Sequence, residues 1–199
     1  MQGGMKCRIV SAFAPLPLAQ PEKGTAVAMG FFDGIHIGHR AVINGAVEWA
    51  RAHGAAPAVF TFRLPTENKM KGKRLLSTED KHALIASLGV EHYLCPDFEE
   101  IKAMTPEQFV LGIVRDCRAR ALVCGENFTF GAKAAGNPEL LRELIAKTGG
   151  FPFYKRPMTL HRPKGSFTNP QGIYLVKKRT LQNAKSFFLA GLAGFEPTG

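Results

Sequence analysis

Short apolar runs alternate with longer amphipathic segments along the first 158 residues of the chain. Residues 25–30 form a nearly continuous apolar run that ends at a glycine, which is typical of a buried strand. Residues 36–53 instead repeat their apolar positions every three or four residues and stop before Gly54, which is typical of a helix with a glycine C-cap. By the same criteria we predict strands at residues 25–30, 57–62, 91–95, 121–124 and 151–154, and helices at residues 36–53, 77–89, 105–117 and 137–149.

This regular alternation predicts an α/β fold in which helices cover both faces of a parallel sheet, a three-layer α/β/α arrangement of the Rossmann-like kind. Such sheets bind ligands beyond the carboxyl ends of their strands, at the point where the strand order reverses. We therefore expect the binding site among the loops at residues 31–38, 63–76 and 125–136.

The last quarter of the chain departs from this pattern. Prolines and glycines interrupt residues 157–172, and only residues 177–192 return to helical spacing. We therefore divide the chain into an α/β domain at residues 1–158 and a diverged, basic C-terminal segment at residues 159–199. The whole chain has a net charge of +10, and most of that excess follows residue 150, where eight basic residues accompany a single acid.

The charge distribution and the apolar content decide which partners we expect. A basic tail is compatible with nucleic-acid binding, but no nucleic-acid-binding motif accompanies it, so we expect anionic small molecules instead. No stretch reaches the roughly 18 apolar residues that span a bilayer, and the N-terminus lacks the pattern of a secretory signal. We therefore expect a cytoplasmic protein without a membrane partner. The four cysteines lack Cys-x-x-Cys spacing, which argues against a zinc site and favours burial, and nothing in the sequence indicates an oligomeric state.

The most informative segment is the glycine- and histidine-rich loop at residues 30–39, between the first predicted strand and its helix. Unpaired N–H groups and the helix dipole at such a position attract anions, typically phosphate. Gly34 and Gly38 let a ligand approach the backbone closely. His36 and His39 lie three residues apart on one face of the first helical turn. There, both rings can donate hydrogen bonds to phosphate oxygens, and a polyphosphate would favour their charged form.

Such a site needs no nucleophile from the protein, because it can bind ATP and stabilise the charge that develops as the α-phosphate is attacked. The residues alone leave two alternatives open. Each histidine could be a packing or surface residue, or both could join Asp33 at a zinc ion, although no further ligand can be named. The segment is neither a Walker loop, which requires Gly-Lys-Ser/Thr, nor a dinucleotide-binding fingerprint.

Gly-x-Phe-Asp-Gly-x-His-x-Gly-His at residues 30–39 resembles the signature of the FMN adenylyltransferase (FAD synthetase) domain, which in bacteria is usually fused to a riboflavin kinase. Gly-Glu-Asn-Phe-Thr-Phe-Gly at residues 125–131 is similar to a second loop of that family. Residues 75–90 and 105–109 resemble its second helix and the start of its third. The resemblance covers roughly residues 5–158, and both loop motifs fall where a parallel sheet binds ligands.

The resemblance implies an enzyme that transfers the adenylyl group of ATP to FMN, which gives FAD and pyrophosphate with the help of Mg²⁺. It implies that His36 and His39 hold the ATP phosphates and the transition state. The residues that it assigns to ATP binding are Gly30, Phe32, Asp33, Gly34, Gly38 and Asn127. The residues that it assigns to the flavin are Phe62, Asn68, Phe128 and Phe130. It assigns no magnesium ligand. Asp33 could instead orient the loop through backbone hydrogen bonds, and Phe128 and Phe130 could instead pack in the core.

The chain departs from the family pattern at three places. Residues 62–66 have Phe-Arg-Leu-Pro-Thr where the family usually has Phe-x-Pro-His-Pro. The family's Ser-Ser/Thr-x-Arg segment, whose arginine reaches the ATP phosphates, is matched only by Ser-Phe-Thr-Asn at residues 166–169. Lys177, Lys178 or Arg179 could supply the missing charge. The chain ends at Gly199, where a riboflavin kinase domain would begin, so we expect no kinase activity.

These departures define two alternatives to an FMN adenylyltransferase. Loss of the arginine is compatible with a catalytically impaired module that binds a nucleotide or a flavin. The altered residues 62–66 are compatible with a nucleotidyltransferase that uses another phosphorylated acceptor.

Overall fold

The computed structural model describes residues 8–10, 16, 21–64, 76–148 and 173–176. Six strands form one sheet in the order β1-β4-β3-β2-β5-β6, and all neighbouring strands run parallel. The strands are β1 (Arg8–Val10), β2 (Thr25–Met29), β3 (Ala56–Phe60), β4 (His92–Leu94), β5 (Ala119–Gly125) and β6 (Ile173–Val176). The predicted parallel α/β fold is confirmed.

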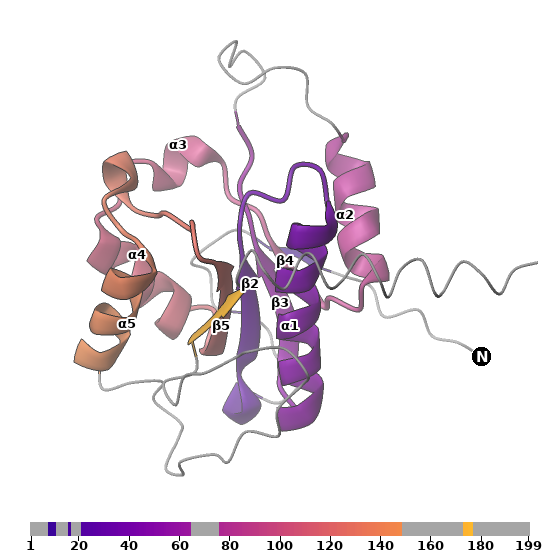
Figure 1. The fold of residues 1–199 in the computed structure, drawn as a ribbon, viewed down its shortest axis with the longest axis horizontal. Helices are drawn as coiled ribbons and strands as arrows, with labels where there is room; N and C mark the ends of the chain where they lie inside the picture. The colour runs from indigo at the N-terminus through magenta and orange to yellow at the C-terminus, as the bar shows by residue number, and fades with distance from the viewer. Residues whose placement is uncertain (1–7, 11–15, 17–20, 65–75, 149–172, 177–199) are drawn as a thin grey trace, which may run out of the picture.

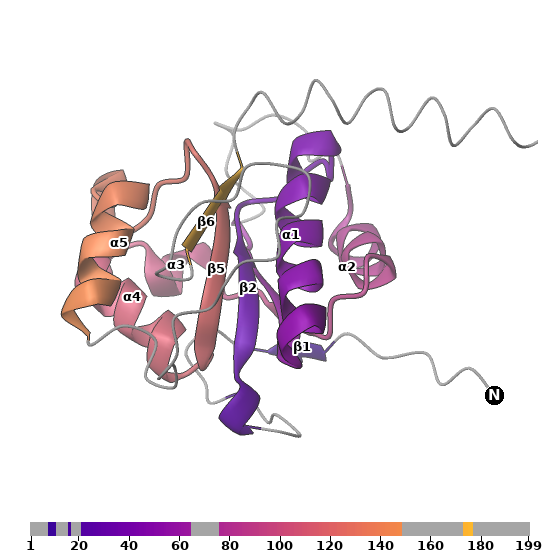
Figure 2. The same cartoon turned by 60° about the horizontal axis from the view of Figure 1, so that its bottom comes forward.

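Helices cover both faces of this sheet, so that the molecule has three layers (Figures 1 and 2). One face carries α1 (Ile37–His53) and α2 (Thr78–Ser87), and the other carries α3 (Phe98–Ile101), α4 (Pro106–Arg115) and α5 (Pro138–Lys147). The side chains of β2 alternate between the two layers: Val27 and Met29 pack with α3, α4 and α5, whereas Ala26 and Ala28 pack with α1 and α2. Two short 3-10 turns, η1 (Pro21–Lys23) and η2 (Ala132–Ala134), complete the described elements.

The helices begin where the sequence places caps. Thr105 forms a capping box with Gln108 ahead of Pro106, and the side chains of Ser77 and Asn137 cap α2 and α5. These side chains accept hydrogen bonds from N–H groups that the first helical turn leaves unpaired. The predicted boundaries of these helices are therefore correct to within two residues.

The strand order reverses at β2. The chain runs from β2 to β3 and then to β4 on one side, and it crosses back to place β5 on the other side of β2. Because all strands are parallel, the loops after β2 and β5 leave the same edge of the sheet and diverge over opposite faces. The two loops that carry the sequence motifs are therefore neighbours across the crevice at this point.

The short elements β1, α3 and β6 and the two 3-10 turns were not predicted. β1 and α3 have three and four residues, too few for a periodic pattern. β6 pairs with β5 although it lies within residues 159–199, which we expected to depart from the α/β pattern, so the sheet extends beyond the predicted domain boundary. The predicted strand at residues 151–154 and helix at residues 177–192 lie outside the described residues, and the two-part division of the chain stays a prediction.

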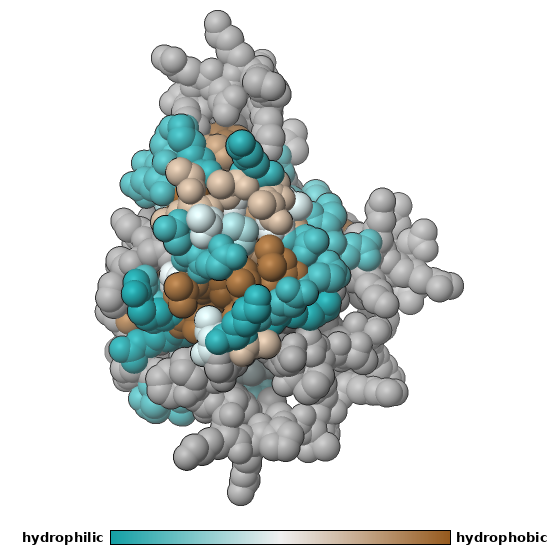
Figure 3. All heavy atoms as spheres, turned by 90° about the vertical axis from the view of Figure 1, so that its left-hand side faces the viewer, coloured by the Kyte–Doolittle hydropathy of each residue, from teal (hydrophilic) through white to brown (hydrophobic). Residues whose placement is uncertain are grey.

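The outer surface of α4 and α5 carries a group of apolar side chains surrounded by polar ones (Figure 3). Among the described residues, Leu111 of α4 is the large apolar side chain with the greatest exposure, 49 %. Cys95, Cys117 and Cys124 are buried, as predicted, and Cys7 lies outside the described ranges. Within those ranges no helix has the length and apolar character that crossing a membrane requires.

Candidate active site

The loop between β2 and α1 has an unusual backbone that buried side chains hold in place. Phe32 and Ile35 have positive φ angles of 51° and 40°, which non-glycine residues seldom adopt. Both side chains are buried, at 1 % and 4 % exposure, and pack with the core beneath α1. Gly30 leaves room for this arrangement, because a Cβ there would lie 2.9 Å from the Phe32 ring. Burial of two apolar side chains therefore fixes the backbone that leads into α1.

His36 is the N-cap of α1. Its Nδ1 accepts hydrogen bonds from the backbone N–H groups of Gly38 at 3.1 Å and His39 at 3.4 Å. These two bonds use the Nδ1 lone pair, so Nε2 is the ring nitrogen that is left to donate to a ligand. The ring also lies against that of His39, with 3.7 Å between centroids. The N–H groups that would bind an anion are thus covered by the His36 side chain, which an anion can replace.

His39 is held neutral by its surroundings. Burial of the ring is the main cause that lowers the pKa of His39 from 6.5 to about 4, with electrostatic repulsion from His36 and Lys81 adding to it and Asp33 opposing it. Its ring packs edge-on against Phe32 with 5.3 Å between centroids, and its buried Nδ1 has no hydrogen-bond partner within the described part of the chain. A phosphate at the start of α1 would offset this shift, because a nearby negative charge stabilises imidazolium.

This lowered pKa predicts a pH dependence of stability. Because the folded protein binds a proton at His39 less readily than the unfolded chain does, the neutral ring stabilises the fold above pH 6.5 and that contribution is lost as the pH falls toward 4. We expect the free energy of unfolding of the wild type to fall more between pH 7 and 4.5 than that of His39→Gln. Urea unfolding at both pH values measures this. Equal losses in the two proteins would contradict the account.

A cleft of about 890 Å³ opens where the loops after β2 and β5 meet. The predicted site residues that line it are Gly30, Phe32, His36, Gly38, His39, Phe62, Asn127, Phe128 and Phe130. Asp33 and Gly34 belong to the same loop as the histidines but do not line the cleft, and Asn68 lies outside the described residues. The structure therefore brings most of the candidate residues together, while their individual roles stay predictions.

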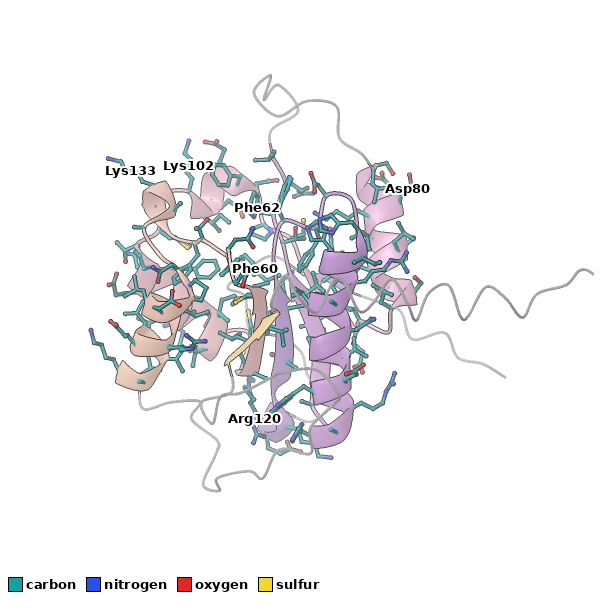
Figure 4. The ribbon with its side chains drawn as sticks, in the orientation of Figure 1. Phe60, Phe62, Asp80, Lys102, Arg120 and Lys133 are labelled. Carbon is teal, nitrogen blue, oxygen red and sulfur yellow. The ribbon has the colours of Figure 1, made fainter. Side chains whose placement is uncertain are left out.

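Aromatic rings form one wall of the cleft. Phe31 and Phe62 lie 5.0 Å apart between centroids, and Phe62 lies 5.3 Å from Phe98 (Figure 4 places Phe62 above Phe60). Phe128 and Phe130 lie nearly parallel at 5.8 Å. A flat apolar ring system fits such a surface by stacking.

Phe128 and Phe130 differ in burial, which bears on whether they pack in the core. Phe130 is 6 % exposed, belongs to the core and lies 5.2 Å from Phe109, and a Cβ on Gly136 would approach its ring to 2.6 Å. Phe128 is only partly buried against the same core. Core packing therefore explains the burial of Phe130, although its ring also reaches the cleft. Phe128 is the residue of the two whose ring has exposed surface for a ligand.

The sequence patterns missed part of the lining. Phe31, Phe98, Lys102 and Lys133 line the cleft although no motif singles out their side chains. Lys102, whose ammonium pairs with Glu99, follows α3, and Lys133 belongs to η2; Figure 4 shows both at the same end of the molecule. The sequence did carry a signal for α3, because Asp97, Glu99 and Glu100 are acidic and acidic residues favour a first helical turn.

The segments that depart from the family pattern lie partly within the described residues. Arg63 and Asp97 form an exposed ion pair at 2.9 Å, which joins the segment after β3 to the N-cap of α3. The segment at residues 166–169 and the basic residues Lys177, Lys178 and Arg179 fall outside the described ranges.

No metal site emerges from the part of the chain that the structure describes. Among those residues no group of three His, Cys, Asp or Glu side chains is placed to hold an ion, so the zinc alternative with His36, His39 and Asp33 has no ligand set there. Mg²⁺ prefers oxygen ligands and often binds through substrate phosphates with few protein ligands. The described residues offer no protein cage for Mg²⁺, and we assign none of them to it.

One family model spans both of the motif loops. The family model described as FAD synthetase matches residues 18–166. The chain belongs to the FAD synthetase family. The family resemblance seen in the two sequence motifs is therefore confirmed.

Several relatives of this FAD synthetase-family chain are known. The bifunctional riboflavin kinase/FMN adenylyltransferase of Escherichia coli K12 is 33 % identical over 129 residues, and that of Bacillus subtilis 168 is 32 % identical over 144 residues. The matches cover 62 % and 68 % of this chain but only 41 % and 45 % of those proteins. A Geobacillus thermodenitrificans relative, 33 % identical over 120 residues, is matched over 67 % of its length. The chain therefore spans less than half of the first two relatives.

A crystal structure of a macrolide-efflux protein from Streptococcus pneumoniae has a similar fold, with a TM-score of 0.59 and 18 % identity. The match covers 86 % of this chain and 49 % of that one. At this identity the likeness concerns the fold alone.

Proposed function

We propose that this FAD synthetase-family chain is an FMN adenylyltransferase that uses ATP and FMN to form FAD and pyrophosphate. The observation that carries the proposal is the meeting of the two motif loops across one cleft, at the point where the strand order reverses. The histidine loop offers a site for phosphates, and the loop after β5 offers Asn127 and the Phe128 ring.

In this reaction an oxygen of the FMN phosphate attacks the α-phosphorus of ATP. The bond between that phosphorus and its bridging oxygen breaks, and pyrophosphate leaves with the electron pair. The protein supplies position and charge: the N–H groups at the start of α1, the Nε2–H of His36 and the ring of His39 donate to phosphate oxygens as negative charge builds up. His39 accepts a proton more readily once phosphate is beside it, which adds positive charge where the reaction needs it.

The aromatic wall serves the second substrate. Phe62 and Phe128 have exposed ring surface in the cleft, and an isoalloxazine ring can stack on either. Asn127 can hydrogen-bond to the edge of a base through its amide. We expect Mg²⁺ to enter with the ATP phosphates, where it neutralises part of their charge. A cytoplasmic location belongs to the same proposal, because Cys95 and Cys124 are buried without a disulfide, which fits a reducing compartment.

A direct assay tests the proposal. The purified chain is incubated with ATP, FMN and Mg²⁺, and FAD and pyrophosphate are measured together. We expect both products in equal amounts. ATP binding without either product in excess enzyme would overturn the assignment as a catalyst and favour a module that only binds.

A thermal-shift series separates FMN from other acceptors. We expect ATP and FMN each to raise the melting temperature, because a ligand that binds only the folded state stabilises it. Stabilisation by ATP but not by FMN would favour a nucleotidyltransferase with a different phosphorylated acceptor.

A further inference from the structure

Lys81 is a buried lysine beside the histidine loop. It stands in α2, and only 9 % of it is exposed, although lysine is seldom buried without partners. Its ammonium reaches across to residues that are 50 and 20 positions earlier in the chain. Neither sequence motif includes this residue.

The ammonium of Lys81 ties three elements together. Its Nζ donates to the Phe31 carbonyl oxygen at 2.5 Å and to Thr61 Oγ1 at 2.8 Å. Thr61, just after β3, donates from the same Oγ1 to the same carbonyl at 2.8 Å. The carbonyl of Phe31 is thus fixed from two sides at the point where the chain leaves β2.

The Phe31 carbonyl lies at the start of the loop between β2 and α1, so its position affects the conformation of that loop. Phe31 is followed by Phe32, whose φ angle is 51°, and four residues later His36 caps α1. The ammonium also lies 5.0 Å from the centre of the Phe31 ring, and that ring lies 5.0 Å from Phe62 in the aromatic wall. Lys81 therefore contacts Phe31 twice. The backbone of Phe31 leads into the histidine loop, and its ring belongs to the aromatic wall of the cleft.

We propose that Lys81 is a positioning residue for adenylyl transfer: by holding the Phe31 carbonyl against Thr61 it fixes where the imidazole rings of His36 and His39 stand. The effect on turnover rests on the proposed function. A second effect does not, because the charge of Lys81 also acts on His39, which His36 and Asp33 face as well. Removing the ammonium takes away one of the influences that keep His39 neutral.

The test compares three substitutions with a control. Lys81→Met keeps the length of the side chain and removes its charge, Thr61→Val removes the hydroxyl and keeps the charge of Lys81, and Lys81→Arg keeps a cation. The control is Lys147→Met, which removes an exposed lysine from the last turn of α5. The measurements are kcat and KM for ATP and FMN, the melting temperature, the dissociation constant of ATP, and the NMR titration of the His39 ring in protein without substrates.

We expect Lys81→Met to lower kcat by about tenfold or more with a smaller change in KM, because displacement of reacting groups by an ångström costs up to about a hundredfold. Its His39 should titrate at higher pH than in the wild type. Thr61→Val should also lower kcat but leave the His39 titration in place, and Lys81→Arg should recover part of the lost turnover. Lys147→Met should match the wild type in every measurement.

Turnover in Lys81→Met equal to that of Lys147→Met would overturn the proposal, as would a loss of turnover that merely follows a loss of folded protein. Should Lys81→Met not fold, Thr61→Val decides: an unchanged kcat overturns the proposal, and a lowered kcat in folded protein supports it. Should the wild type form no FAD, the proposed function fails. Lys81 is then judged by ATP binding and the His39 titration, which must both change in Lys81→Met.

Discussion

His39→Ala is expected to lower kcat for FAD formation by about 10²–10³-fold, the usual cost of removing one donor that faces developing charge. The ring of His39 lines the cleft at the first turn of α1, and its Nδ1 has no hydrogen-bond partner within the described part of the chain. The substitution removes a half-buried ring and leaves the cap of α1, which His36 provides, in place. Steady-state kinetics with ATP and FMN measure kcat, and a thermal melt measures the stability of the variant.

His36→Ala is the matched comparison. It removes both a phosphate donor and the N-cap, so it should lower turnover similarly and also cost about 1 kcal/mol of stability. For both variants activity should fall far more than stability. Losses of folded protein that account for the whole loss of activity would support the alternative in which the histidines only pack.

Phe32→Ala is expected to destabilise the fold by about 3–5 kcal/mol, the usual cost of deleting a buried phenylalanine ring. Phe32 is 1 % exposed, packs against the core under α1 and meets the His39 ring edge-on. Alanine keeps the unfavourable positive φ angle and gives up the burial that offsets it. Urea unfolding measures the loss, and a loss below about 1 kcal/mol would contradict this account.

Phe128→Ala is the control for a ring in the same cleft. Phe128 is only partly buried, so its removal should cost about 1 kcal/mol of stability. It should instead raise KM for FMN, because the variant loses a stacking surface. Together, Phe32→Ala and Phe128→Ala distinguish a ring that stabilises the loop from a ring that contacts the ligand. The family motif alone does not make this distinction.

The parts of the fold that depend on local sequence could be predicted. The cap residues Ser77, Thr105 and Asn137, and the αL glycine at Gly54, act on their own helix ends, so the sequence shows them directly. The position of the cleft could also be predicted, because a parallel sheet with one reversal of strand order has a crevice at that reversal.

What could not be predicted depends on contacts between distant residues. α3 and β6 have four residues each and form by packing or pairing with neighbours that the local pattern does not reveal. The contacts of Lys81 join residues 50 and 20 positions apart. The burial of Phe130 depends on Phe109 and on the small size of Gly136, so its packing role could not be separated from a ligand role by sequence alone.

The same limit applies to His36. Two histidines three residues apart predict two phosphate donors, but the structure uses Nδ1 of His36 as an acceptor that caps the helix. Only its Nε2–H remains to donate in this conformation. An anion at the helix start therefore competes with an intramolecular cap, which the spacing of the residues does not indicate.

The most direct test of the account is the backbone NMR response to a non-hydrolysable ATP analogue. If triphosphate binds at the start of α1, the amides of Gly38 and His39 should show the largest shifts, the Asn127 amide should also move, and the His39 ring should titrate at a higher pH than about 4. The chemical shift of the Leu111 amide, on the outer surface of α4, should not change. Saturable binding of the analogue with Gly38 and His39 unmoved would contradict the central claim.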